Sequence, residues 1–104
     1  MILVTTPDVP GRRITKVLGL VRGNTIRARH IGYDISARFK NMVGGEIGDY
    51  TKMMSEAREQ AIDRLIEDAE ALGANAVVAV RFSTNSMMQG AAELMVYGTA
   101  VEIE

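Results

Sequence analysis

The chain has no cysteine and no tryptophan, and it has one histidine in 104 residues. The absence of cysteine excludes disulfide bonds, thiolate metal sites and a cysteine nucleophile. The aromatic residues are two phenylalanines and three tyrosines, so a folded core must be largely aliphatic. No apolar run approaches the roughly 20 residues of a membrane-spanning helix, and the first residues lack the basic start of a signal peptide. These absences predict a cytoplasmic protein with no membrane partner.

Neither sign of charge predominates, because the chain has 12 basic and 13 acidic residues. A net charge of −1 supplies no general attraction to nucleic acid. The basic residues are nevertheless uneven: residues 1–45 hold eight of them and two acidic residues, Asp8 and Asp34. This asymmetry indicates either an anionic partner or complementary charges between copies of the chain. We favour the second, since no aromatic residues alternate with the basic ones as in a surface that binds single strands.

The composition and length predict a single folded domain over residues 1–104 with 47% hydrophobic and 24% charged residues. Aliphatic runs predict short strands over residues 2–5 and 14–21, with a turn at 22–24 and a short extension at 25–27. A first helix is predicted over residues 30–43. Two more strands are predicted over 75–84 and 93–103, joined by a polar connection over 85–90.

The second helix has the clearest pattern. Asp49 is a suitable N-cap, because its carboxylate can accept bonds from the first free backbone N–H groups. Gly73 suits the left-handed position just after the helix ends. The helix carries one apolar stripe, which consists of Tyr50, Met53, Met54, Ala57, Ala61, Leu65, Ala69 and Leu72. The predicted order is therefore ββααββ, a small antiparallel α+β sheet with one long helix packed across it.

Two of the predicted strands are apolar on both faces, over residues 77–80 and 94–97. A strand with one face in water normally alternates apolar and polar residues, whereas a strand covered on both faces does not. One helix covers one face of a sheet. We therefore expect another copy of the chain to cover the second face, which predicts a homo-oligomer.

Four separated stretches carry a resemblance to a known family. They are Thr5-Thr6-Pro7, the glycine-rich residues 43–50, residues 71–80 with their helix stop, and residues 97–101. In this order they resemble the YbjQ-like family, a family of unknown function that is labelled as heavy-metal binding. The resemblance implies a subunit like that of dodecin, assembled as a pentamer whose sheets pack into an oligomeric barrel.

Candidate metal ligands are few. His30 and Asp34 are four residues apart and would share one face of a helix, so together they could hold a cation. The alternative interpretation is a helix ion pair on a solvated face. Two ligands do not complete a specific site, so a third would have to come from another subunit. The residues alone therefore predict no metal site and no cofactor.

A second candidate is the glycine-rich stretch before the second helix. Gly44 and Gly45 allow a close backbone approach to a ligand or a neighbouring subunit, and Tyr50 could stack on what is bound. The alternative interpretation is a tight helix–helix turn.

No nucleotide-binding or hydrolase motif is present, so an enzyme is not expected. The sequence predicts a non-enzymatic oligomer that binds a small ligand or partner at subunit interfaces, and heavy-metal binding is the alternative.

Overall fold

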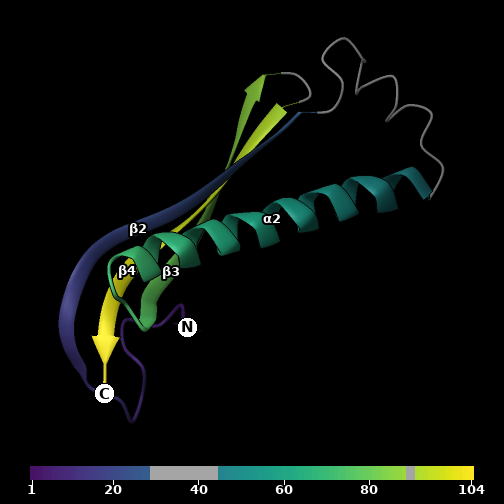
Figure 1. Ribbon diagram of the computed structural model, residues 1–104. Helices are drawn as coiled ribbons and strands as arrows, with labels where there is room; N and C mark the ends of the chain where they lie inside the picture. The colour runs from purple at the N-terminus through teal and green to yellow at the C-terminus, as the bar shows by residue number, and fades with distance from the viewer. Residues whose placement is uncertain (29–44, 89–90) are drawn as a thin grey trace.

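The computed structural model describes residues 1–28, 45–88 and 91–104, which form one sheet and one helix (Figure 1). The elements are listed in chain order: β1 (Ile2–Leu3), β2 (Ile14–Ala28), α2 (Gly45–Ala71), β3 (Ala76–Met88) and β4 (Ala91–Ile103). The strand order across the sheet is β1-β3-β4-β2. The helix crosses one face of the sheet, which confirms the α+β class.

The sheet is mixed, and this corrects the expectation of a purely antiparallel one. β4 pairs antiparallel with both β2 and β3, whereas β1 runs parallel to β3. The predicted first helix over residues 30–43 lies outside the described residues. No helix within the described ranges combines the length and the apolar character that a membrane span requires.

The predicted turn at residues 22–24 is wrong. β2 continues through these residues, and Arg22, Gly23 and Asn24 pair with consecutive residues of β4. Gly23 lies where β2 crosses α2, because a Cβ built on it would come within 2.6 Å of the backbone nitrogen of Leu65. The glycine thus allows a close approach of strand and helix rather than a change of chain direction.

The predicted start of α2 is also wrong, because the helix begins at Gly45 and Asp49 lies inside it. Gly48 also lies inside α2, because a glycine costs only about 1 kcal/mol in a helix and packing elsewhere along the helix can offset that cost. β3 likewise extends beyond the predicted end, so Asn85 belongs to a strand rather than to a connection. Its side chain can point to water at the sheet edge while its backbone pairs with β4.

The predicted helix end is confirmed. α2 ends at Ala71, and Gly73 has a φ of 83°. The backbone N–H of Gly73 donates to the carbonyl of Glu70 at 2.9 Å, and that of Ala74 donates to the carbonyl of Ala69 at 3.1 Å. These two bonds form a Schellman motif, which satisfies carbonyls that the helix leaves free.

We expect Gly73→Val to lower the free energy of unfolding by about 1–2 kcal/mol, because a Cβ in the left-handed region clashes with its own backbone. Gly73→Asn is the matched control and should lose less, since asparagine tolerates this conformation. Thermal unfolding of both variants at one protein concentration measures the difference. A Gly73→Val protein that melts within a degree of the wild type would contradict the capping role.

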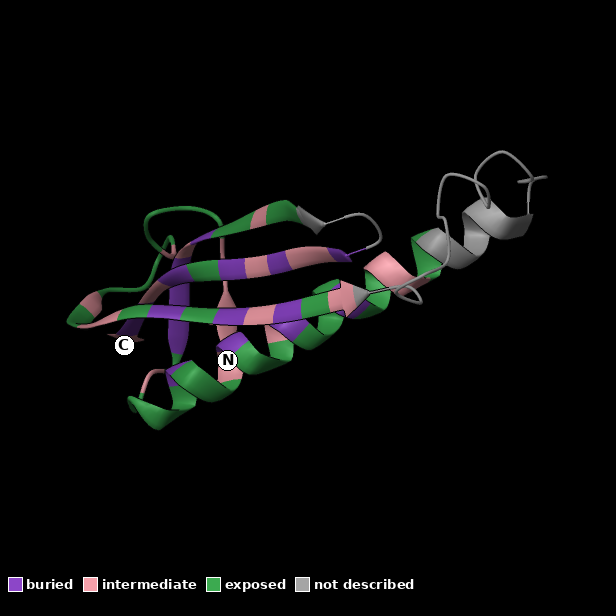
Figure 2. Ribbon diagram, turned by 90° about the horizontal axis from the view of Figure 1, so that it is seen from above, coloured by how far each residue is buried: buried purple, intermediate pink, exposed green. Residues whose placement is uncertain are grey.

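Two apolar clusters lie on opposite faces of the sheet. Figure 2 shows where buried residues occur along the strands and along α2. The first lies under α2 and confirms the middle of the predicted helix stripe, since Ala57, Ala61, Leu65 and Ala69 are completely buried. It also contains Val21, Val77, Val80, Leu94, Val96 and Ala100. The end of the stripe is less covered than predicted, because Leu72 is 45% exposed.

The second cluster corrects the expectation that one sheet face has no cover from its own chain. Val78 is 5% exposed and packs with Ala76, Val101 and Ile103 on the face opposite α2. This cluster is covered by side chains of the N-terminal segment and the start of β2, which are Ile2, Val4, Val9 and Ile14. The chain's own first residues therefore cover the half of this face next to the termini.

A β-bulge separates the covered half of β3 from the rest. The pairing with β4 shifts between Val78 and Arg81, and Ala79 has a φ of 54°. The backbone N–H groups of Ala79 and Val80 donate to the carbonyls of Thr6 and Val4. The bulge turns Val80 toward α2 and Arg81 toward the opposite face.

Candidate functional site

The predicted site residues are not gathered into a site by the described part of the chain. His30, Asp34 and Gly44 lie outside the described residues. Gly45 is the first residue of α2 rather than part of a loop, and Tyr50 lies five residues further along the same helix. No group of three histidine, aspartate or glutamate side chains that could hold a metal ion is found among residues 1–28, 45–88 and 91–104.

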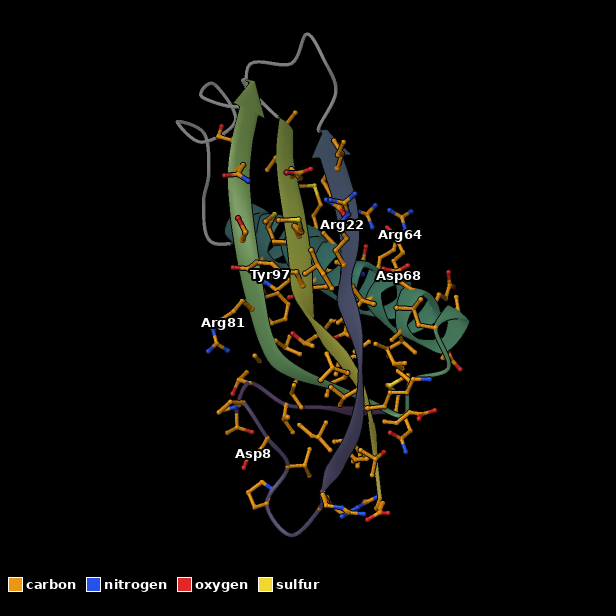
Figure 3. All side chains as sticks on the ribbon, turned by 90° about the vertical axis from the view of Figure 1, so that its left-hand side faces the viewer. Asp8, Arg22, Arg64, Asp68, Arg81 and Tyr97 are labelled. Carbon is orange, nitrogen blue, oxygen red and sulfur yellow. The ribbon has the colours of Figure 1, made fainter. Side chains whose placement is uncertain are left out.

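The outer face, defined as the sheet face opposite α2, is exposed in its distal half, away from the termini (Figure 3). Three large apolar side chains there are open to solvent: Leu20 is 71% exposed, Ile26 is 60% exposed and Tyr97 is 37% exposed. Strand alternation explains the placement, because Val21 and Val96 next to them point into the core under α2. The distal outer face therefore carries large apolar side chains that the described residues leave uncovered.

A row of three side chains crosses the distal outer face. Tyr97 of β4 pairs with Arg22 of β2 on one side and with Arg81 of β3 on the other. Figure 3 shows the three in this order across the strands, with α2 behind them. Cross-strand partners share a face of the sheet, so the register places one arginine on each side of the tyrosine.

The two arginines differ in their contacts. The Arg81 Nη1 donates to the backbone carbonyls of Thr5 and Val80, both at 2.8 Å, which turns its side chain toward the N-terminal segment. The Arg22 side chain has no hydrogen-bond or ion-pair partner among the described residues. Arg22 is thus available to a ligand or a neighbouring molecule.

A hollow of about 260 Å³ lies beside this row. Its lining consists of Leu20, Arg22, Met95 and Tyr97. Three of these side chains present apolar or aromatic surface, and Arg22 adds one positive charge. This pattern of an apolar lining with one convergent charged group is typical of small-molecule sites.

A larger groove of about 540 Å³ runs between the edge of β2 and the C-terminal half of α2. The helix uses it to bind the strand: Asp68 accepts the backbone N–H of Arg22 at 3.2 Å, and Arg64 donates to the carbonyl of Asn24. These side chains bond to backbone groups on the open edge of β2. Unpaired backbone groups at a sheet edge otherwise allow another chain to pair with the strand. The groove is therefore a structural contact between strand and helix.

A third hollow, of about 170 Å³, lies between β3, α2 and the N-terminal segment. Its lining is apolar apart from one hydroxyl and consists of Leu3, Val4, Thr5, Ile62, Leu65, Val80 and Phe82. It offers no charged group that could orient a ligand.

Sequence reasoning did not single out Arg22 and Tyr97 as site residues. In the sequence, Arg22 is one of the eight basic residues of the first 45, and Tyr97 ends the stretch 94–97 that is apolar on both faces. The two are 75 positions apart, and they meet because β2 and β4 pair with Arg22 opposite Tyr97. The sequence feature that could have identified Tyr97 was the apolar character of both faces of residues 94–97, because one helix covers only one of them.

Three comparisons relate the chain to known proteins. A family model described as "Putative heavy-metal-binding" matches residues 1–104. A UPF0145 protein of Clostridioides difficile (strain 630) is 62% identical over 104 residues, which is 100% of this chain and 93% of that protein. A UPF0145 protein of Methanosarcina acetivorans is 55% identical over 103 residues, which is 99% of this chain and 97% of that protein.

A solved structure has the same architecture. The crystal structure of a DUF74-family protein of unknown function from Pediococcus pentosaceus aligns with a TM-score of 0.68 and 16% identity, covering 100% of this chain and 98% of that one. At this identity the likeness shows the fold alone. The full-length match to the family model and the close relatives together establish that this chain belongs to the YbjQ-like family of UPF0145 proteins.

Proposed function

We propose that this protein is a non-enzymatic homo-oligomer of the cytoplasm that holds a small ligand at its subunit interfaces. The observation that carries the proposal is the distal outer face, on which Leu20, Ile26 and Tyr97 stay exposed after the chain has folded. Soluble monomers rarely expose contiguous apolar patches above a few hundred Å². A second copy is the occupant that we assign to this face.

The edge of β3 supports the same proposal. The N-terminal segment bonds to the outer edge of β3 only as far as Val80. Beyond it, β3 continues to Met88 with no backbone partner on that edge among the described residues. An open strand edge next to an exposed apolar face is a place where another chain adds to a sheet.

A closed ring is the assembly that we favour. Contacts between two different surfaces of one chain, such as the β3 edge and the outer face, join copies head to tail, and such contacts close into rings when the rotation permits. The number of five copies comes from the resemblance to the YbjQ-like family. The absence of an enzymatic motif in the sequence supports the non-enzymatic part of the proposal.

The mass of the full chain in solution tests this directly. Light scattering coupled to gel filtration at micromolar concentration should give a multiple of the 11.3 kDa subunit, expected near five copies. Leu20→Glu should reduce the mass, because a charge would be buried at the interface while the single chain leaves this position 71% exposed. Leu72→Glu is the matched control on a different surface and should keep the wild-type mass. A monomeric wild-type protein would refute the proposal.

Heavy-metal binding is the second candidate, and the family description favours it. The described residues contribute no three-ligand group to it. The candidate ligands His30 and Asp34 lie outside those residues and would need a further ligand from a neighbouring subunit. Elemental analysis of untagged protein, before and after dialysis against a mild chelator, distinguishes the two candidates. Retained stoichiometric metal that is lost in His30→Ala would favour metal binding.

A further inference from the structure

We propose that the hollow lined by Leu20, Arg22, Met95 and Tyr97 binds a small organic anion, a carboxylate or phosphate ester with a single-ring apolar body. The anionic group would pair with the Arg22 guanidinium, and the ring would lie against the three other side chains. This inference rests on the proposed function and names the ligand class for the face assigned to the subunit interface.

The positive charge of the hollow determines the sign of the charge that a ligand should carry. Most arginines of the described chain donate to a carboxylate, amide or carbonyl oxygen, and these are Arg12, Arg13, Arg27, Arg64 and Arg81. Arg22 and Arg58 donate to none among the described residues. Arg22 is the one of these two that lines the hollow. Its positive charge attracts an anion and repels a metal cation.

Two of the carboxylates near Arg22 already accept a hydrogen bond. Asp68 accepts the backbone N–H of Arg22 at 3.2 Å, and Glu93 accepts from the side-chain amide of Asn24 at 3.3 Å. On the other side of Tyr97, Arg81 bonds only to neutral carbonyl oxygens, so its charge is not offset by a carboxylate. Two positive charges on this face therefore lack an ion-paired carboxylate among the described residues, which favours an anion beside Arg22.

The apolar lining and the volume of the hollow determine the size and polarity of the uncharged part of the ligand. Leu20 and Tyr97 present exposed apolar and aromatic surface, and Met95 is half-buried. A cavity of about 150 Å³ holds one benzene ring, so a hollow of about 260 Å³ has room for a ring and its anionic substituent. An aromatic ring can stack against Tyr97, and the flexible thioether of Met95 adapts to its shape.

The test is a titration of the full-length oligomer with phenyl phosphate, followed by isothermal calorimetry or by amide NMR shifts. Benzyl alcohol lacks the charge and inorganic phosphate lacks the ring, so both should bind more weakly than phenyl phosphate. Arg22→Gln should raise the Kd for phenyl phosphate about tenfold, as loss of a charge-assisted hydrogen bond predicts. Arg58→Gln is the matched control, because Arg58 is exposed on α2 and also has no side-chain partner in the part of the chain that the structure describes. The Kd of this variant should equal that of the wild type.

The outcomes separate this inference from the proposed function. An oligomer that does not bind phenyl phosphate, or that binds it equally well in Arg22→Gln, overturns the ligand class and leaves the assembly intact. If Arg22→Gln instead lowers the oligomer mass and the wild type binds no probe, Arg22 holds an acidic side chain of the neighbouring copy, which also overturns the inference. A monomer that binds phenyl phosphate through Arg22 supports the site and refutes the assembly.

Discussion

Replacing Gly23 with alanine is expected to lower the free energy of unfolding by about 3 kcal/mol, at the upper end of the usual cost of overpacking. The added Cβ would lie 2.6 Å from the backbone nitrogen of Leu65 and closer still to the carbonyl oxygen of Ala61. Both atoms belong to the helix backbone, so no side chain can turn aside to make room. β2 and α2 must therefore move apart along their shared contact.

Thermal unfolding at a fixed protein concentration measures this loss, which corresponds to a fall in Tm on the order of 10 °C. Gly11→Ala is the matched control. Gly11 has a φ of 80° and nothing within 4 Å of a built Cβ, so it reports the cost of a left-handed alanine without a clash against another segment of the chain. That cost is about 1 kcal/mol. If Gly23→Ala lost no more stability than Gly11→Ala, the close approach of β2 to α2 would be wrong.

Replacing Leu65 with alanine should cost a comparable 2–5 kcal/mol, the range for removing a fully buried leucine side chain. Leu65 is completely buried at the centre of the cluster under α2, where it packs with Val21, Val77 and Val96. The substitution removes three heavy atoms, Cγ, Cδ1 and Cδ2, and leaves a cavity that the rigid sheet cannot fill.

Denaturant unfolding of Leu65→Ala against Leu72→Ala isolates the effect of burial. Leu72 follows the same helix but is 45% exposed, so its truncation should cost less than about 1 kcal/mol. Equal losses in the two variants would show that α2 does not present Leu65 to the sheet. The difference between the variants is the quantity to compare, because both start from the same leucine.

The helix and its end were predictable because their signals are local. The apolar residues Ala57, Ala61, Leu65 and Ala69 recur at the helical period, and all four are buried under α2. Gly73 follows the helix and adopts the left-handed conformation that glycine favours. Both features depend on residues within one or two turns of each other, so tertiary contacts had little to override.

The predicted turn at residues 22–24 failed because Gly23 has two physical uses. Glycine next to asparagine is typical of a turn, yet Gly23 is needed where β2 passes over α2. The helix residues that require it, Ala61 and Leu65, are about forty positions away in the chain. A local pattern does not distinguish a glycine that bends the chain from one that lets two backbones meet.

The candidate site was only partly predictable from the sequence, because it also depends on contacts between residues far apart in the chain. The glycine-rich stretch indicated a ligand contact by Gly45 and Tyr50, but the structure places both residues on α2. The row of Arg22, Tyr97 and Arg81 depends on the register of three strands, and the bulge at Ala79 determines which face Arg81 takes. A shift of one residue in either pairing would move these side chains to the opposite face.

The sequence by itself determined the α+β class, the long amphipathic helix and its end at Gly73, because periodicity and backbone preference act over a few residues. It also indicated strands with two apolar faces. Only the tertiary structure decided that the N-terminal segment covers one half of the second face and leaves Leu20 and Tyr97 exposed on the other. That division follows from parallel pairing between β1 and β3, a contact between chain segments more than seventy positions apart.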